Sequence, residues 1–190
     1  MPSAEFFLSI KTFSTVLHVL AAVCAMGAAF SADVLFHFFT ADRKLSQAEA
    51  RTLSILSRTV WYGLLAVTAT GAAIFLSDPV GYLASAKFLA KMTIMVILVL
   101  NGVVLDRYVQ TRLLGKGFFT GLQQAFARKV AFVCGTISVV SWISILALGV
   151  VDSVNSPYAS ILGLYAAILG TLITASLAVE RFWFEPKRPQ

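Results

Sequence analysis

The sequence predicts an all-α integral membrane protein: a bundle of five transmembrane helices with the N-terminus outside and the C-terminus in the cytoplasm. Three observations support this. Of the 190 residues, 58% are hydrophobic and only 13% are charged, so long uncharged runs separate the charges. These runs are continuous and do not alternate in polarity, which favours spanning helices over a membrane β-barrel. Finally, Lys and Arg gather in two of the segments between the runs and in the C-terminal tail.

Five of the apolar runs are near the length of about 20 residues that a helix needs to cross the hydrocarbon core. We expect one transmembrane domain over residues 1–190, with spans at about 12–35, 59–76, 83–105, 130–151 and 161–179. Two segments, about 41–58 and 106–129, are too polar to span and are predicted to be cytoplasmic and amphipathic. In the first, Ser46 and Glu49 have the spacing of a capping box, which predicts a helix start.

The basic residues predict the orientation. Twelve of the fifteen Lys and Arg residues lie after the first span, after the third span or in the C-terminal tail, and only Lys11, Lys87 and Lys91 lie elsewhere. Cytoplasmic loops of membrane proteins carry an excess of Lys and Arg. This distribution also explains the net charge of +6 without nucleic acid as a partner. The predicted location is the cytoplasmic (inner) membrane, as a multi-pass protein in contact with the lipid bilayer.

An outer-half polar site is predicted at His18 and Lys91. Each lies about six to eight residues inside the outer end of its span, which places both at about 9–12 Å depth. Intramembrane ionisable groups are costly and often functional, so matched depth predicts a shared cofactor-binding site. The alternatives are that Lys91 snorkels to the outer headgroups and that His18 makes a structural hydrogen bond between helices.

An inner polar cluster is predicted at the other end of the same two spans. Asp33 and His37 are four residues apart, on one face of the first span, and Asn101 and Asp106 lie near the inner end of the third. One interpretation is an interfacial network that fixes the helix ends. The other is a proton entry or an acid that faces a substrate.

Soft metal ligands are sparse. Met92 and Met95 share a helix face, and Cys24 lies at about the depth of Met95, so a Cu(I) site is an alternative. Packing of these side chains in the apolar interior is the simpler interpretation. The sequence contains no Gly-rich phosphate loop, HExxH or CxxC motif, and no catalytic residue is identified.

The stretch "IKTFSTVLHVLAAVCAMGAAF" (10–30) resembles the first span of the copper-resistance D membrane family and of the small-membrane-protein type of protoporphyrinogen oxidase. Shared features are His18 followed by Gly27, the Thr70-Gly71 pair near the end of the second span, and Lys91 in the third. The resemblance covers about residues 10–112. It implies haem b on the iron ligand His18 in the oxidase type, or copper passage in the other. The histidine pair that the oxidase type tends to carry late in the third span is absent.

Three functions follow as hypotheses. The first is a haem-linked redox protein, an oxidoreductase related to the membrane protoporphyrinogen oxidases, with His18 as axial ligand. The second is a transporter or permease for copper or a small solute, with Lys91 and the inner acids along the path. The third is a non-catalytic membrane subunit, which would act in a homo-oligomer or with a partner membrane subunit.

Overall fold

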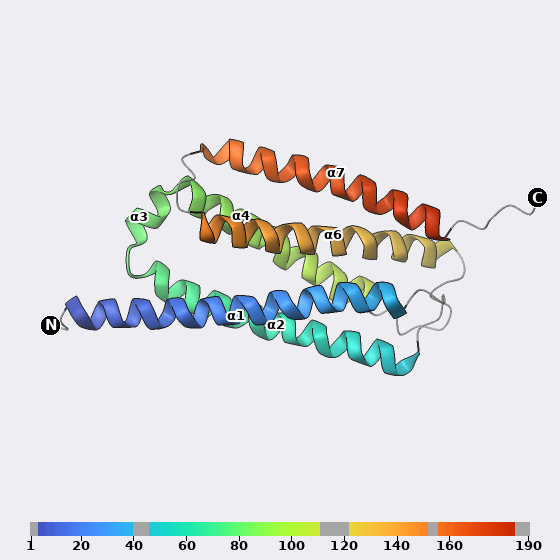
Figure 1. Cartoon of the computed structure of the whole chain (residues 1–190), viewed down its shortest axis with the longest axis horizontal. Coiled ribbons are helices and arrows are strands. Elements are labelled where there is room, and N and C mark those ends of the chain that lie inside the picture. Colours follow the sequence, from blue (N-terminus) through green and yellow to red (C-terminus); the bar gives the residue numbers. More distant parts are fainter. Residues whose placement is uncertain (1–3, 40–45, 111–121, 152–155, 185–190) are drawn as a thin grey trace, which may run out of the picture.

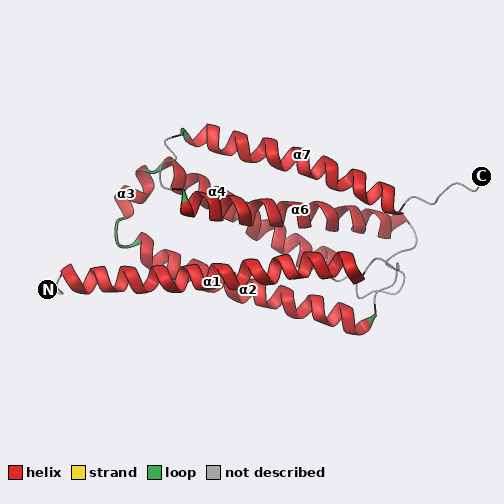
Figure 2. Cartoon of the chain, in the orientation of Figure 1, coloured by secondary structure: helices red, strands yellow, loops and turns green. Residues whose placement is uncertain are grey.

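The computed structural model describes residues 4–39, 46–110, 122–151 and 156–184, and within these ranges the regular structure is entirely helical (Figure 2). The elements in chain order are α1 (Ala4–Phe39), α2 (Gln47–Phe75), α3 (Pro79–Ala84), α4 (Ala86–Val104), the π-helix η1 (Leu105–Gln110), α6 (Leu122–Val150) and α7 (Tyr158–Phe184). The prediction of an all-α fold is therefore confirmed for the described residues.

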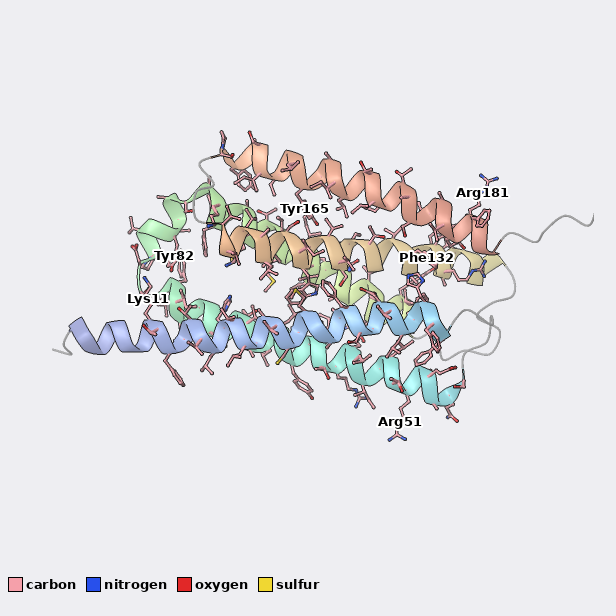
Figure 3. The ribbon with its side chains drawn as sticks, viewed as in Figure 1. Lys11, Arg51, Tyr82, Phe132, Tyr165 and Arg181 are labelled. Carbon is pink, nitrogen blue, oxygen red and sulfur yellow. The ribbon has the colours of Figure 1, made fainter. Side chains whose placement is uncertain are left out.

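The long helices lie side by side and alternate in direction, as Figure 1 shows. α1 and α2 form a hairpin, and α4, α6 and α7 form a three-helix group that packs on it. We call the end of the bundle at which α3 lies the α3 end, and the opposite end, where α1 and α7 finish, the basic end. Lys11 and Tyr82 lie toward the α3 end, whereas Arg51 and Arg181 point outward near the basic end (Figure 3).

Four segments are long and apolar enough to cross a membrane: Lys11–Phe39, Ala86–Val109, Phe126–Val150 and Tyr158–Phe182. They correspond to the predicted first, third, fourth and fifth spans, and they make the chain a multi-pass membrane protein. Many large apolar side chains on them face outward, among them Val34, Phe38 and Leu164. Such a surface suits a lipid solvent better than water.

The prediction of five spans is wrong in its count, because the second span, about 59–76, is not among these segments. The expected amphipathic segment 41–58 and the expected span are not separate elements. From Gln47 onward they form the single helix α2, and residues 40–45 lie outside the described part. Its first half carries Arg51 and Arg58, and its second half contains several Thr and Gly residues, which make it less apolar by composition.

The threonine hydroxyls of α2 form hydrogen bonds with the backbone of the same helix. Thr59, Thr68 and Thr70 each donate to the carbonyl oxygen four residues earlier, at 2.6–3.1 Å. The capping box at the start of α2 is confirmed: the Ser46 amide donates to Glu49 Oε2 at 2.7 Å, and the Glu49 amide donates to Ser46 Oγ at 3.2 Å.

The polar segment predicted at 106–129 is also shorter than expected. Its first residues continue α4 as η1, and residues from Leu122 onward belong to α6, so only 111–121 lie outside the described part. Between the hairpin and the three-helix group, the main core cluster consists of Ala25, Ala29, Leu64, Leu98 and Trp142. Small residues at such contacts let helix backbones approach closely, which is how helices associate in lipid.

Gly63 of α2 packs closely against α1. A Cβ atom at this position would lie 2.5 Å from Ala25 Cβ and 3.0 Å from Ala25 Cα. Gly27, by contrast, has nothing within 4 Å of its Cβ position, although the neighbouring Ala28 and Ala29 are buried.

We predict that Gly63→Leu destabilises the protein by about 1–3 kcal/mol, the usual cost of overpacking a close contact. The measurement is unfolding in mixed detergent micelles, and Gly27→Leu is the matched control because its side chain would meet open space. Equal stabilities of the two variants would contradict the close α1–α2 contact.

Candidate functional site

His18 is held by α2 at the α3 end of the bundle. Its Nδ1 lies 3.0 Å from the Val67 carbonyl oxygen and 3.1 Å from Thr70 Oγ1. The carbonyl can only accept, and the Thr70 hydroxyl is already directed at the Ala66 carbonyl oxygen at 2.6 Å. The Val67 carbonyl and the Thr70 oxygen therefore both need a donor on the imidazole, which places the ring proton on Nδ1. This leaves the Nε2 lone pair for a ligand, the arrangement that orients most metal-binding histidines.

Gly71 allows the imidazole to lie directly on α2. A Cβ atom at Gly71 would stand 3.1 Å from His18 Cε1 and 3.4 Å from Nδ1, closer than most side chains tolerate. Both residues of the Thr70-Gly71 pair therefore help to place His18. The Thr70 hydroxyl contacts its Nδ1, and Gly71 leaves room for its ring because it has no side chain.

Lys91 on α4 is the second residue of this predicted site, which we call the α3-end site. Its ammonium is half-buried and acts electrostatically on the His18 ring, so the structure brings these two predicted residues together. Among the described residues, the Lys91 side chain has no hydrogen bond or ion pair. Lys87, one turn earlier, donates instead to the Val151 carbonyl oxygen at the end of α6. The two lysines therefore differ. Lys87 caps the C-terminal end of α6, whereas the charge of Lys91 is available to a ligand.

Three aromatic rings lie toward the α3 end from this pair. Phe75 follows Gly71 by four residues on α2, and Phe88 precedes Lys91 by three on α4, so each shares a helix face with the site. Their rings stack with centroids 5.8 Å apart, and Tyr82 from α3 lies 5.2 Å from Phe88. Sequence analysis missed this aromatic cluster, although the spacing along α2 and α4 could have indicated it.

The predicted inner residues are arranged mainly around α6. Asp33 on α1 packs over Gly135, where a Cβ atom would be 3.3 Å from Asp33 Oδ1. Asn101 on α4 donates from Nδ2 to the Cys134 carbonyl oxygen at 2.9 Å. Asp33 and Asn101 are thus joined through one short segment of α6, which contacts both α1 and α4 at this depth.

The other two predicted inner residues have different neighbours. His37 packs edge-on against Phe132 of α6, with ring centroids 5.0 Å apart. Asp106 on η1 accepts from Ser57 Oγ of α2 at 3.3 Å. The structure therefore separates the predicted inner cluster into an α1–α6 seam with Asn101 nearby, and a separate α2–η1 contact.

A buried ion pair lies at the basic end, and sequence analysis missed it. Arg128 Nε of α6 is 3.5 Å from Glu180 Oε1 of α7, and the two side chains are 11% and 4% exposed. Both charges are about 26 residues from the middle of the α6–α7 connection. In an antiparallel helix pair, that symmetry could have indicated the contact.

The soft ligands proposed for copper have different surroundings. Met95 packs on the main core cluster, Met92 lines an open groove with Tyr158, and Cys24 is exposed. Within the described ranges there is no group of three or more His, Cys, Asp or Glu side chains that could hold a metal ion.

In comparisons with known proteins, no family model, no curated protein and no solved structure matches this chain. The resemblance to the copper-resistance D and oxidase families therefore stays a prediction.

We predict that Glu180→Ala and Arg128→Ala each lower the unfolding free energy by about 3–5 kcal/mol, because each breaks a buried ion pair. The double variant should be less destabilised than the sum of the two. A double-mutant cycle in mixed micelles measures this, with Arg181→Ala as the neighbouring, exposed control. Additive losses would contradict an interaction between the two charges.

Proposed function

We propose that this multi-pass membrane protein binds an anionic, redox-active ligand at the α3 end, with His18 as the ligand of its metal and Lys91 as the partner of its negative charge. The main support for this proposal is the pair of His18 and Lys91. The His18 imidazole is fixed through Nδ1 to the Val67 carbonyl, and the nearby Lys91 ammonium has no partner in the described structure. An intramembrane charge without a protein partner favours a functional role over a structural one.

Haem b fits the chemistry of these residues. The Nε2 of His18 would bind iron, and Lys91 would pair with a propionate. A haem bound in this way supplies one-electron redox chemistry. The chain contains one other histidine, His37, which lies 19 residues farther along α1, or about 28 Å away. Ligation within one chain would therefore use a single imidazole.

The protein's residues would also control the surroundings of such a ligand. Thr70 and the Val67 carbonyl keep the imidazole in the tautomer that binds metal. Gly71 lets the ring lie against α2, and the aromatic cluster of Phe75, Tyr82 and Phe88 lies between the pair and the tip of the α3 end. A flat conjugated ligand suits these aromatic neighbours.

We also propose that the basic end faces the cytoplasm and that the protein lies in the inner membrane. At this end the described helices carry Arg51, Arg107, Arg128, Lys129 and Arg181, whereas the α3 end carries Lys11, Lys87 and Lys91. α2 is not among the four apolar segments, but it runs back beside α1, so the chain begins at the α3 end and α7 finishes at the basic end (Figure 1). The positive-inside rule would then place the N-terminus outside and the C-terminus in the cytoplasm.

The orientation is tested by reporter fusions at Pro79, beside α3, and after Gln190. We expect a reporter that works only outside the cytoplasm to be active at Pro79, and one that works only in the cytoplasm to be active after Gln190. Activity of the cytoplasmic reporter at Pro79 would reverse the proposed orientation.

The ligand site is tested by titration of the purified protein with haemin, followed by the Soret band. We expect His18→Ala to abolish binding of the iron, and Lys91→Leu to weaken affinity by at least about tenfold, or about 1.4 kcal/mol. The matched controls are His37→Ala and Lys87→Leu, which remove the same side-chain types elsewhere. Unchanged binding in His18→Ala would refute His18 as the axial ligand.

A further inference from the structure

The α1–α6 seam brings two ionisable groups of α1 into line. Asp33 packs over Gly135, and one turn farther along α1, His37 packs on Phe132, which lies three residues before Gly135 on the antiparallel helix. Asp33 and His37 are separated by about 6 Å along the helix axis. Asp33 is partly buried, whereas His37 is exposed and only two residues from the end of α1 at the basic end.

The deeper part of this seam contains two buried acceptors without a donor. Asp33 Oδ2 is buried and, among the described residues, has no hydrogen-bond partner. The same is true of Asn101 Oδ1, whose residue is only 7% exposed, and which is held by its Nδ2 on the adjacent Cys134 carbonyl. A buried acceptor without a donor carries a substantial desolvation cost, and an ionised carboxylate carries a larger one.

The groups that face Asp33 do not supply the missing donor or a compensating positive charge. From α6 the ionisable neighbour is the Cys134 thiol, and from α4 the nearby side chain is the uncharged Asn101. The ionisable side chains of the α2 segment that packs on α1 here are Arg58, which is exposed, and Tyr62, which is 72% exposed. Toward the basic end, Arg128 is paired with Glu180, and Asp106 accepts from Ser57.

We propose that Asp33 is a proton-exchange group of the bundle interior, reached from the basic end through His37. A proton on Oδ2 removes the charge and turns one orphaned acceptor into a donor. On release, the carboxyl O–H bond breaks, and the proton passes through a water molecule to an imidazole nitrogen of His37 and then to bulk water. Uptake reverses these steps, and no electrons are transferred.

This site is independent of the proposed ligand site. Asp33 lies 15 residues from His18, about 22 Å along α1, and the apolar core cluster around Ala25, Ala29 and Trp142 lies between them. A role in proton transfer would therefore hold whether or not the α3-end site binds haem.

The test is infrared spectroscopy of the purified protein, which detects the C=O stretch of a protonated carboxyl and its shift on exchange into D2O. We expect this band in the wild type and its loss in Asp33→Asn. Asp106→Asn is the matched control, since it removes an acid at the same end of the bundle whose Oδ1 already accepts from Ser57; this variant should keep the band.

A second measurement does not depend on folding of the Asp33 variant. Wild-type protein grown with carboxyl-labelled aspartate should show an isotope shift of the same band. Absence of a protonated-carboxyl band in the wild type, a band without an isotope shift, or its persistence in Asp33→Asn would each overturn the proposal.

The route through His37 has its own test. His37→Phe keeps an aromatic ring against Phe132 but removes the nitrogen that carries the proton. We expect the band to remain in this variant and its exchange with D2O to slow by at least about tenfold. Exchange at the wild-type rate would overturn the role of His37 as the relay.

Discussion

In hydrocarbon a polar side chain can bind only to its own helix, to a neighbouring helix or to a ligand, and this constraint explains most of the contacts in the bundle. Several hydroxyl groups donate hydrogen bonds to backbone carbonyl oxygens of their own helix. Others join helices: Ser141 meets Tyr165 at 2.9 Å, and Thr93 meets Tyr158 at 3.0 Å, which ties α6 and α4 to α7. The groups left over after these pairings are therefore few, and they carry the most information about function.

Those remaining groups lie on both sides of one apolar layer. Toward the α3 end, Lys91 supplies a positive charge beside His18, and toward the basic end, Asp33 and Asn101 supply unsatisfied acceptors. Leu64, Leu98 and Trp142 fill the junction of the helices between them, and within this layer Trp142 Nε1 is a further buried group without a hydrogen-bond partner among the described residues. At about 22 Å and an effective dielectric constant of about 20, two unit charges interact by only about 0.7 kcal/mol. The charge state of one site therefore has little direct effect on the other.

The sequence was sufficient to predict most of the helices, because uncharged runs of the right length are a strong signal in a membrane protein. The prediction is wrong at α2 because a charged residue does not end a helix. Residues 47–62 contain no Gly or Pro, so nothing ends the helix between its polar and apolar halves. The pair of Arg128 and Glu180 was missed because these charges, too, lie within helices. Matched depth suggested that His18 and Lys91 share a site, but the contacts of Thr70 and Gly71 depend on helix rotation, which the sequence does not specify. For the same reason, Asp106 was grouped with Asn101, although it faces α2.

The internal hydrogen bonds of the threonines have a consequence for how α2 is solvated. A hydropathy scale assigns every threonine the cost of burying a free hydroxyl. In Thr59, Thr68 and Thr70, each hydroxyl proton is instead directed at a backbone oxygen. These side chains therefore present mainly their methyl groups to the surroundings. Transfer of this helix from water to an acyl-chain environment therefore costs less than its composition indicates. The same hydrogen bond leaves Thr70 able to act as an acceptor beside His18. Its hydroxyl proton is bound to the Ala66 carbonyl oxygen, and the lone pairs of Oγ1 can accept from the imidazole. One side chain is therefore compatible with lipid and still helps to orient the His18 ring.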